Sequence, residues 1–419
     1  MGVQMIDLTR ANGQVHFGVG IEDTFVVHSS PGHRRLEEYE LTQHYQNLDE
    51  DFDLIAGSGA SFVRYGLPWY RVCPERRSYD WDIADRMIDG LVSRGLQVVL
   101  DLVHYGTPTW LSDEFANADY PQVVSEYAAA LADRYGDVVY GWTPLNEPQW
   151  TARLCGESAT WPPALTGHDG YLRILDSICR GIVMTHEAIG AASWRRPTFV
   201  DVEASFRYVM APGVISEEAE LLSQRRFLAL DLVTGRVDED HPMAGYIAQY
   251  GPAIDLAWYD RHAIKLDVLG LNYYPMWSTI EYSLRDGQVS GIERDDGVVG
   301  LEDVIRTYGA RYGAPIVLTE TSYEGDELAR TTWLGEVASA ISRIDQESNV
   351  TGLVWWPFLD QIKWQYREGI DPLNEYLHRL GLVTLECTSD GSFRRCPNDV
   401  YSAYRTLACQ RDKACGQTA

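Results

Sequence analysis

The chain has 419 residues, 45% of them hydrophobic, and a formal net charge of −26 at pH 7. That length fits one large α/β barrel or two smaller domains, and the hydrophobic share is enough to bury a sizeable core. A surface this acidic repels phosphate backbones, so we expect no nucleic-acid partner.

Short apolar runs alternate with helical patterns along the whole chain. Eight runs have the continuous apolar character of strands that are buried on both faces, and they lie at 15–20, 61–69, 96–105, 138–148, 197–204, 266–274, 314–321 and 350–360. Helically spaced apolar residues are clearest at 81–95, 120–136, 169–190 and 331–345. This alternation predicts an α/β fold, a single (β/α)8 barrel with long loops at the carboxyl ends of its strands. No repeat or linker divides the chain, so we expect one domain over 1–419, with about 384–419 forming a closing helix and tail.

Cysteine spacing and hydropathy bear on where the protein resides. The seven cysteines, none of them in a CxxC pair, are at 73, 155, 179, 387, 396, 409 and 415. We expect the first three to be free buried thiols, whereas the last four could pair. No run approaches 18 uninterrupted apolar residues, and the first residues lack the apolar core of a signal peptide. We therefore predict a cytoplasmic protein without a membrane span, and leave its oligomeric state open.

Polar side chains recur where the predicted strands end. In the segment WTPLNEPQW (142–150), Asn146 and Glu147 lie at the end of the fourth predicted strand. Comparable groups in or after the other strands are Arg64, His104, Asn272, Tyr273, Tyr274, Glu320, Trp355, Trp356 and Asp360. The carboxyl ends of barrel strands meet at one rim. Burying so many polar groups there without partners would cost free energy, so they indicate a site.

Two of these groups, Glu147 and Glu320, stand at the ends of the fourth and seventh strands, which face each other across a barrel. Two carboxyl groups across a pocket suit glycoside hydrolysis, in which one protonates the leaving oxygen. The other attacks the anomeric carbon or activates water. Tryptophans near such a pocket offer flat apolar faces for sugar rings.

Several motifs, in their order along the chain, resemble those of glycoside hydrolase family 1, the β-glucosidase family among the retaining (β/α)8 glycosidases. TPLNEP is similar to its T-x-N-E-P motif with one extra residue, and LTETS keeps the Glu of its T-E-N-G motif but not the Asn-Gly. Other similar segments are 62–72, 104–111, 266–274, 354–364 and 379–383. The resemblance covers about 15–383.

The resemblance implies a role for each residue of the site. Glu147 would be the general acid/base, with a raised pKa, and Glu320 the nucleophile. Arg64 would help to keep that nucleophile charged, and Tyr274 would contact it through its hydroxyl. Asn146 would bind the sugar 2-hydroxyl. Further substrate-binding positions are His104, Asn272, Trp356 under the ring, Trp364, and Trp150 on the leaving-group side.

The chain departs from the family where the sugar is held. The family's glutamine after the first strand is absent, and Glu22 or Asp23 could take its place. Lys363 replaces a glutamate that holds the far hydroxyls of glucose. A carboxylate accepts hydrogen bonds whereas an ammonium donates them, so the preferred sugar need not be glucose. The lysine could favour an acidic or phosphorylated sugar, or could point to solvent.

The leading interpretation is a retaining β-glycosidase acting on small soluble β-glycosides. A transglycosylase would use the same covalent intermediate with a sugar or alcohol acceptor. A non-catalytic sugar-binding protein on the same fold is the third reading, and the presence of both Glu147 and Glu320 argues against it. Neither a metal-binding motif nor a complete dinucleotide loop occurs, so we expect no cofactor and no metal.

Overall fold

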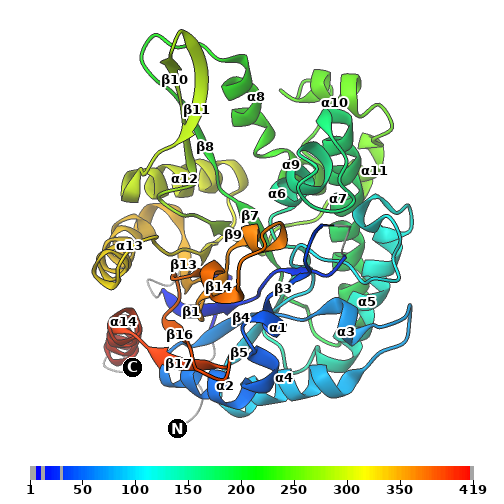
Figure 1. Ribbon diagram of the computed structural model, residues 1–419. Helices are drawn as coiled ribbons and strands as arrows, with labels where there is room; N and C mark the ends of the chain where they lie inside the picture. Colours follow the sequence, from blue (N-terminus) through cyan, green and yellow to red (C-terminus); the bar gives the residue numbers. More distant parts are fainter. Residues whose placement is uncertain (1–5, 11–14, 29–31, 416–419) are drawn as a thin grey trace.

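A ring of parallel strands forms the centre of the protein (Figure 1), of which a computed structural model describes residues 6–10, 15–28 and 32–415. The strands are β1 (His16–Ile21), β4 (Phe62–Gly66), β5 (Gln97–Asp101), β6 (Gly141–Thr143), β7 (Val200–Ala204), β9 (Val268–Asn272), β12 (Ile316–Glu320) and β13 (Val350–Trp355). Their order is β6-β5-β4-β1-β13-β12-β9-β7, and bridges from Trp142 to Phe199 and from Asn146 to Val202 join the two outer strands. Each strand falls on one of the eight predicted runs, and the predicted (β/α)8 barrel is confirmed.

Helices surround this ring, as the alternating pattern predicts. The main ones are α2 (Leu48–Gly57), α4 (Trp81–Ser93), α5 (Tyr120–Tyr135), α7 (Gly167–Ala192), α12 (Gly297–Tyr312) and α13 (Glu327–Ser348). Helix α4 shows why they form: its apolar side chains recur on one face and are buried. The Asp80 carboxylate accepts a hydrogen bond from the Asp82 N–H at its start, and Gly95, at φ +80°, follows its end.

The longest connections carry structure of their own. The residues after β7 form β8 (Arg207–Met210), α8 (Glu217–Arg225), α9 (Leu228–Val233), α10 (Ala244–Tyr250) and α11 (Leu256–Arg261). Strand β8 pairs with β10 (Thr279–Arg285), which pairs with β11 (Gln288–Glu293), and this three-stranded sheet projects from the barrel (Figure 1). We did not predict this sheet. Strand β11 is exposed over most of its length, so it lacks the apolar runs that reveal the barrel strands.

Short elements occur in the connections that follow the barrel strands. They are β2 (Phe25–Val26), β3 (Leu36–Glu37), α1 (Glu38–Leu41), α3 (Trp69–Val72), α6 (Pro148–Ala152), β14 (Gln361–Ile362) and β15 (Leu377–His378). The C-terminal segment forms a hairpin of β16 (Val383–Cys387) and β17 (Phe393–Pro397), and then α14 (Asp399–Cys415). The expected closing helix is present, and the hairpin before it is an addition.

Apolar and polar layers divide the barrel interior. Phe62, Val200 and Val268, each the first residue of its strand, belong to a buried cluster. Asp101, Asn272 and Glu320, each the last residue of its strand, are also buried. The barrel is therefore packed with hydrocarbon at the amino ends of its strands and carries polar groups at the carboxyl ends.

The state of the cysteines and the hydropathy of the helices match the expectations from the sequence, as far as the structure describes them. Cys73, Cys155 and Cys179 are buried free thiols, as expected, and Cys387, Cys396 and Cys409 are free as well. The side chain of the seventh cysteine, residue 415, lies outside the described set. Over the described part of the chain, no helix is both long and apolar enough to cross a membrane. The cytoplasmic location stays a prediction.

Candidate active site

A buried guanidinium organises the polar end of the barrel. Arg64, in β4, is 1% exposed. Its Nη1 donates to Glu22 Oε1 at 2.8 Å and to Glu320 Oε1 at 2.6 Å, and its Nη2 donates to Asp101 Oδ2 and to Asn146 Oδ1, both at 2.7 Å. One cation thus balances three buried carboxylates while its planar fork fixes their directions.

Glu320 sits at the end of β12, between this guanidinium and a tyrosine. Its Oε1 accepts from Arg64, and its Oε2 accepts from the Tyr274 hydroxyl at 2.8 Å. The side chain lines the cavity described below, although the residue is only 3% exposed. The structure therefore presents a carboxylate that is held at both oxygens and that faces open space.

Glu147 has the opposite kind of environment, since none of the described Lys, Arg or His side chains forms an ion pair with it. It precedes α6 with the left-handed backbone angles φ 49° and ψ 65°. Its Oε1 accepts from Asn272 Nδ2 at 2.8 Å, and its Oε2 accepts from the Tyr105 hydroxyl. Burial chiefly, and then the nearby charge of Glu320, raise the pKa of Glu147 to about 7, against the lowering effect of these two hydrogen bonds. Such a carboxyl group holds a proton near neutral pH, as a general acid must.

Two asparagines connect the two glutamates. Asn272 is the register partner of Glu320 across β9 and β12, and its Nδ2 lies 3.3 Å from Asn146 Oδ1 as well as near Glu147. The Thr319 hydroxyl donates to Asn272 Oδ1 at 2.7 Å. Because that oxygen is occupied by a donor, the amide nitrogen of Asn272 must face Glu147. The strand ends thereby hold both carboxyl groups in one hydrogen-bonded network.

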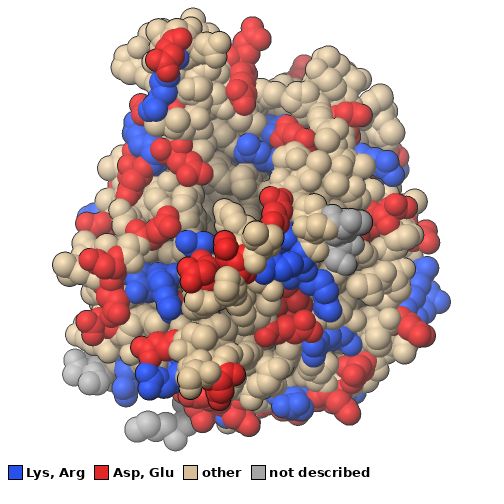
Figure 2. Space-filling model, viewed as in Figure 1, with Lys and Arg blue, Asp and Glu red and all other residues tan. Residues whose placement is uncertain are grey.

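A cavity of about 710 Å³ opens above this network, in the face that is hollowed in Figure 2 below the β10–β11 hairpin. Its lining includes both glutamates and the expected substrate-binding residues His104, Trp150, Asn272, Tyr274, Trp356, Lys363 and Trp364. A volume of this size suits a small ligand. The site residues predicted from distant parts of the sequence therefore share one cavity.

Aromatic rings form several walls of the cavity. The Trp356 indole donates to the Glu22 carbonyl at 2.9 Å and lies edge-on to Tyr274. Trp364 packs edge-on against Tyr105 at 5.6 Å between ring centroids, and Trp150 packs against Phe206 at 4.8 Å. These walls are flat and apolar, with polar atoms only at their edges, which suits the faces of a sugar ring.

Three of the predicted substrate-binding residues lie beneath the cavity and do not line it. Arg64 and Asn146 are turned to the carboxylates, as described above. Glu22, one of the two residues that could take the place of the family's glutamine, is fully buried against Arg64, and burial raises its pKa well above the usual range. Asp23, the other, is buried and does not line the cavity either. Thr24, two residues after Glu22, lines the cavity instead.

One polar wall of the cavity was missed by the sequence analysis. Gln361, in β14, is paired in register with His378, in β15, and their side-chain nitrogens are 3.4 Å apart. His378 Nε2 is 3.4 Å from Glu324 Oε1. Lys363 is the half-buried neighbour of this group, and among the described residues its ammonium has no ion-pair partner. Only the fold reveals this wall, because its members come from three separate segments.

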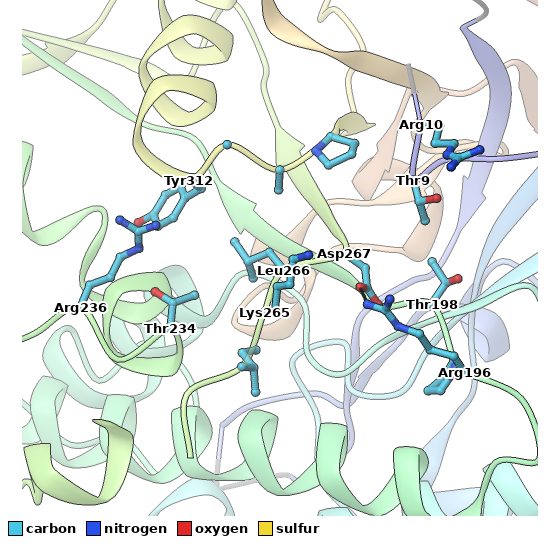
Figure 3. A pocket seen from close by; sticks show the side chains of 15 residues that line it. Thr9, Arg10, Arg196, Thr198, Thr234, Arg236, Lys265, Leu266, Asp267 and Tyr312 are labelled. Carbon is cyan, nitrogen blue, oxygen red and sulfur yellow. Dashed lines mark hydrogen bonds and ion pairs between the residues drawn. The ribbon is translucent and has the colours of Figure 1, made fainter. Parts of the chain in front are cut away.

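A second cavity, of about 720 Å³, lies at the other end of the barrel and lacks paired carboxylates (Figure 3). Among its lining residues, Asp267 and Pro315 directly precede the first residues of β9 and β12, and Thr198 lies two residues before β7. Asp267 is its one acidic lining residue, and it pairs with Arg196 at 2.5 Å. Of these two cavities, the first is the one that offers two carboxyl groups for acid/base chemistry.

Metal ligation does not explain the polar cluster. Among the residues that the structure describes, no three His, Cys, Asp or Glu side chains are placed to hold a metal ion. The carboxylates around Arg64 are instead balanced by its guanidinium. That the protein needs no metal or cofactor stays a prediction.

Comparisons with known proteins agree with this geometry. The family model described as glycosyl hydrolase family 1 matches residues 11–202. Thermostable β-glucosidase B of Thermobispora bispora is 26% identical over 410 residues, which cover 87% of this chain and 80% of that protein. Aryl-phospho-β-D-glucosidase BglC of Bacillus subtilis is 23% identical, with 83% of each chain covered.

Solved structures show the same fold. A β-glucosidase from Thermotoga maritima in complex with glucoimidazole superimposes with a TM-score of 0.81 and 19% identity, over 96% of this chain and 99% of that one. A family 1 β-glucosidase from the same organism gives a TM-score of 0.79 over 96% and 98%. At this identity, the likeness establishes the barrel fold alone, and the chemistry must be argued from the residues of this chain.

Proposed function

We propose that this chain, a divergent member of glycoside hydrolase family 1, is a retaining β-glycosidase that hydrolyses small β-glycosides. The observation that carries the proposal is the unequal pair of buried carboxyl groups in one aromatic cavity. Glu147 has a pKa of about 7, and Glu320 is held against a guanidinium. Glycoside cleavage by this route requires a proton donor and a carboxylate nucleophile in one cavity, and the two groups are placed for these roles.

In the first half of the reaction, Glu320 attacks the anomeric carbon. The bond from that carbon to the glycosidic oxygen breaks, and its electron pair goes to the oxygen, which takes the proton of Glu147. An ester between the sugar and Glu320 results. Tyr274 and Arg64, which hold the two oxygens of Glu320, orient the carboxylate for this attack.

In the second half, Glu147 acts as a base. Its carboxylate takes a proton from water while the water oxygen bonds to the anomeric carbon. The ester bond breaks, and its electron pair returns to Glu320. Glu147 has then regained its proton, and the sugar leaves with the configuration it had in the substrate.

Hydrolysis of a panel of aryl β-glycosides, with and without added sugar or alcohol acceptors, tests this proposal. A hydrolase releases the aryl group and the free sugar in equal amounts. Transfer to the acceptor in most turnovers would favour the transglycosylase reading, because the same ester intermediate would then go to another hydroxyl. Binding of the glycosides without any release would support a sugar-binding protein and contradict the proposal.

We expect that substitution of Lys363 will change the sugar preference. It lines the cavity next to Trp364, in the segment that resembles the family's sugar-holding glutamate. In Lys363→Glu, a donor becomes an acceptor and the local charge reverses. A hydrogen bond to a charged group contributes about 1.5–3 kcal/mol, so ratios of kcat/KM between sugars should shift by about ten- to a hundredfold. The expected loss is largest for the glucuronide, whose carboxylate the lysine would attract.

The measurement is kcat/KM for the aryl glucoside, galactoside, fucoside, xyloside and glucuronide. Lys265→Glu is the matched control, since it makes the same charge change at the opposite end of the barrel. The control should leave the ratios unchanged. Equal scaling of all five substrates by Lys363→Glu would show that the lysine does not meet the sugar.

A further inference from the structure

Tyr105 contacts the acid/base carboxyl group directly, and nothing above gives it a role. It lies after β5, is 5% exposed and adopts a left-handed backbone conformation with φ 64°. Its hydroxyl donates to Glu147 Oε2, and its ring packs edge-on against Trp161 and Trp364. These aromatic contacts hold the ring in place, so the position of the hydroxyl is set by the fold.

We propose that Tyr105 is a positioning residue that, together with Asn272, places the proton of the acid/base on Oε2 of Glu147 and stabilises the carboxylate left after that proton has gone. The inference rests on the proposed function, because it assigns a task to Glu147 that only a glycosidase needs. The two can nevertheless fail separately, as the test below shows.

Oε1 of Glu147 is unsuited to carry the proton of the acid form. That oxygen faces Asn272 Nδ2 at 2.8 Å, and an amide nitrogen can only donate. The amide of Asn272 is held from turning over, because its own oxygen accepts from the Thr319 hydroxyl at 2.7 Å. A proton on Oε1 would therefore point at another donor. The proton of the acid form must reside on Oε2.

Tyr105, the partner of Oε2, can form a hydrogen bond with both the protonated and the ionised carboxyl group. A tyrosine hydroxyl can either donate or accept, whereas an amide nitrogen cannot accept. When Glu147 is protonated, the Tyr105 oxygen accepts from Oε2; when Glu147 is ionised, the hydroxyl turns and donates to it. Tyr105 thus remains a partner in both states. The tyrosine never gives up its own proton, because burial, together with the charges of Glu147 and Glu320, raises its pKa well above the usual range.

The hydrogen bond from Tyr105 also changes the pKa of Glu147. The hydroxyl gives its stronger, charge-assisted hydrogen bond to the ionised form of Glu147. It therefore lowers the pKa of that group, in opposition to burial. Without the hydroxyl, the acid form should persist to higher pH. The base form, which the second half of the reaction needs, should be correspondingly scarce near neutral pH.

The test is the pH dependence of kcat/KM for an aryl β-glycoside with Tyr105→Phe in the full chain. In the unaltered protein, activity should fall as the pH rises through about 7, because Glu147 then loses its proton. In Tyr105→Phe, this alkaline limb should move up by about one to two pH units, which is what loss of a charge-assisted hydrogen bond amounts to. A tyrosine that served only for packing would leave the limb in place.

Tyr273→Phe is the matched control. Tyr273 is also buried at a strand end, but its hydroxyl donates to the Gly297 carbonyl at 2.9 Å, and the residue does not line the cavity. Its loss should leave the alkaline limb unmoved. If Tyr105→Phe is poorly folded, incorporation of 3,5-difluorotyrosine at 105 keeps the ring and makes the hydroxyl a stronger donor. The limb should then move down.

Two outcomes separate the inference from the function on which it rests. An alkaline limb that disappears in Glu147→Gln but stays in place with phenylalanine or difluorotyrosine at 105 overturns the role of Tyr105 alone. If Glu147→Gln keeps both its activity and its limb, Glu147 is not the acid, and the proposed function fails with the inference. Opposite shifts by the two Tyr105 changes support both.

Discussion

Replacement of Glu320 by glutamine is expected to lower kcat by roughly 10⁴- to 10⁶-fold, the scale on which removal of a covalent nucleophile acts. A carboxamide cannot form the ester with the anomeric carbon. The variant should fold normally, because glutamine has nearly the shape of glutamate and its oxygen can still accept from Arg64 or Tyr274. It should also still bind the substrate, since the cavity walls are unchanged.

The measurement is turnover of an aryl β-glycoside alongside thermal unfolding of the same preparation. Glu336→Gln makes the same chemical change at an exposed position of α13 and should be indistinguishable from the unaltered protein. If Glu320→Gln kept more than a few per cent of the original turnover, the nucleophile would be another residue.

The largest effect on stability is expected for Arg64→Met. The change leaves Glu22, Asp101 and Glu320 buried without their shared cation. Removing one side of a buried ion pair costs about 3–5 kcal/mol, because the remaining charge cannot return to water. Denaturant unfolding should show a loss of at least this size.

The loss should depend on pH in a definite direction. Burial raises the pKa of the Glu22 carboxyl group well above its usual range, and the charge of Arg64 opposes that rise, so loss of Arg64 should raise this pKa further. Stability from such groups is present at low pH and is lost as the pH rises through the raised values. The deficit of Arg64→Met should therefore grow from pH 5 to pH 8. Arg76→Met, which breaks an exposed pair with Glu126, should change stability little at either pH. An equal, pH-independent loss in both variants would contradict the central role of Arg64.

The barrel could be predicted because its strands are buried on both faces. Such strands appear in the sequence as continuous apolar runs, and their alternation with helical patterns leaves few possible folds. Glu147 and Glu320 could be found because they end the fourth and seventh of these runs, in segments that resemble the N-E-P and T-E-N-G motifs of glycoside hydrolase family 1. By contrast, strand β11 is mostly exposed, so its sequence has no apolar pattern that would predict a strand.

The rest of the site depends on contacts between distant segments. In the sequence, Tyr105 is simply an aromatic residue after a strand, and only the fold shows that its hydroxyl donates to Glu147. The placement of Glu22 follows from Arg64, whose charge draws the carboxylate under the cavity floor. The pairing of Gln361 with His378 depends on the register of two short strands, which no local pattern specifies.

The most direct test of the account is the anomeric configuration of the first product. Proton NMR can record the sugar released from an aryl β-glycoside before it mutarotates in water. Two successive displacements at the anomeric carbon, by Glu320 and then by water, should yield the β-anomer first. An α-anomer as the first product would mean a single displacement by water, and would contradict the covalent role of Glu320 on which the account rests.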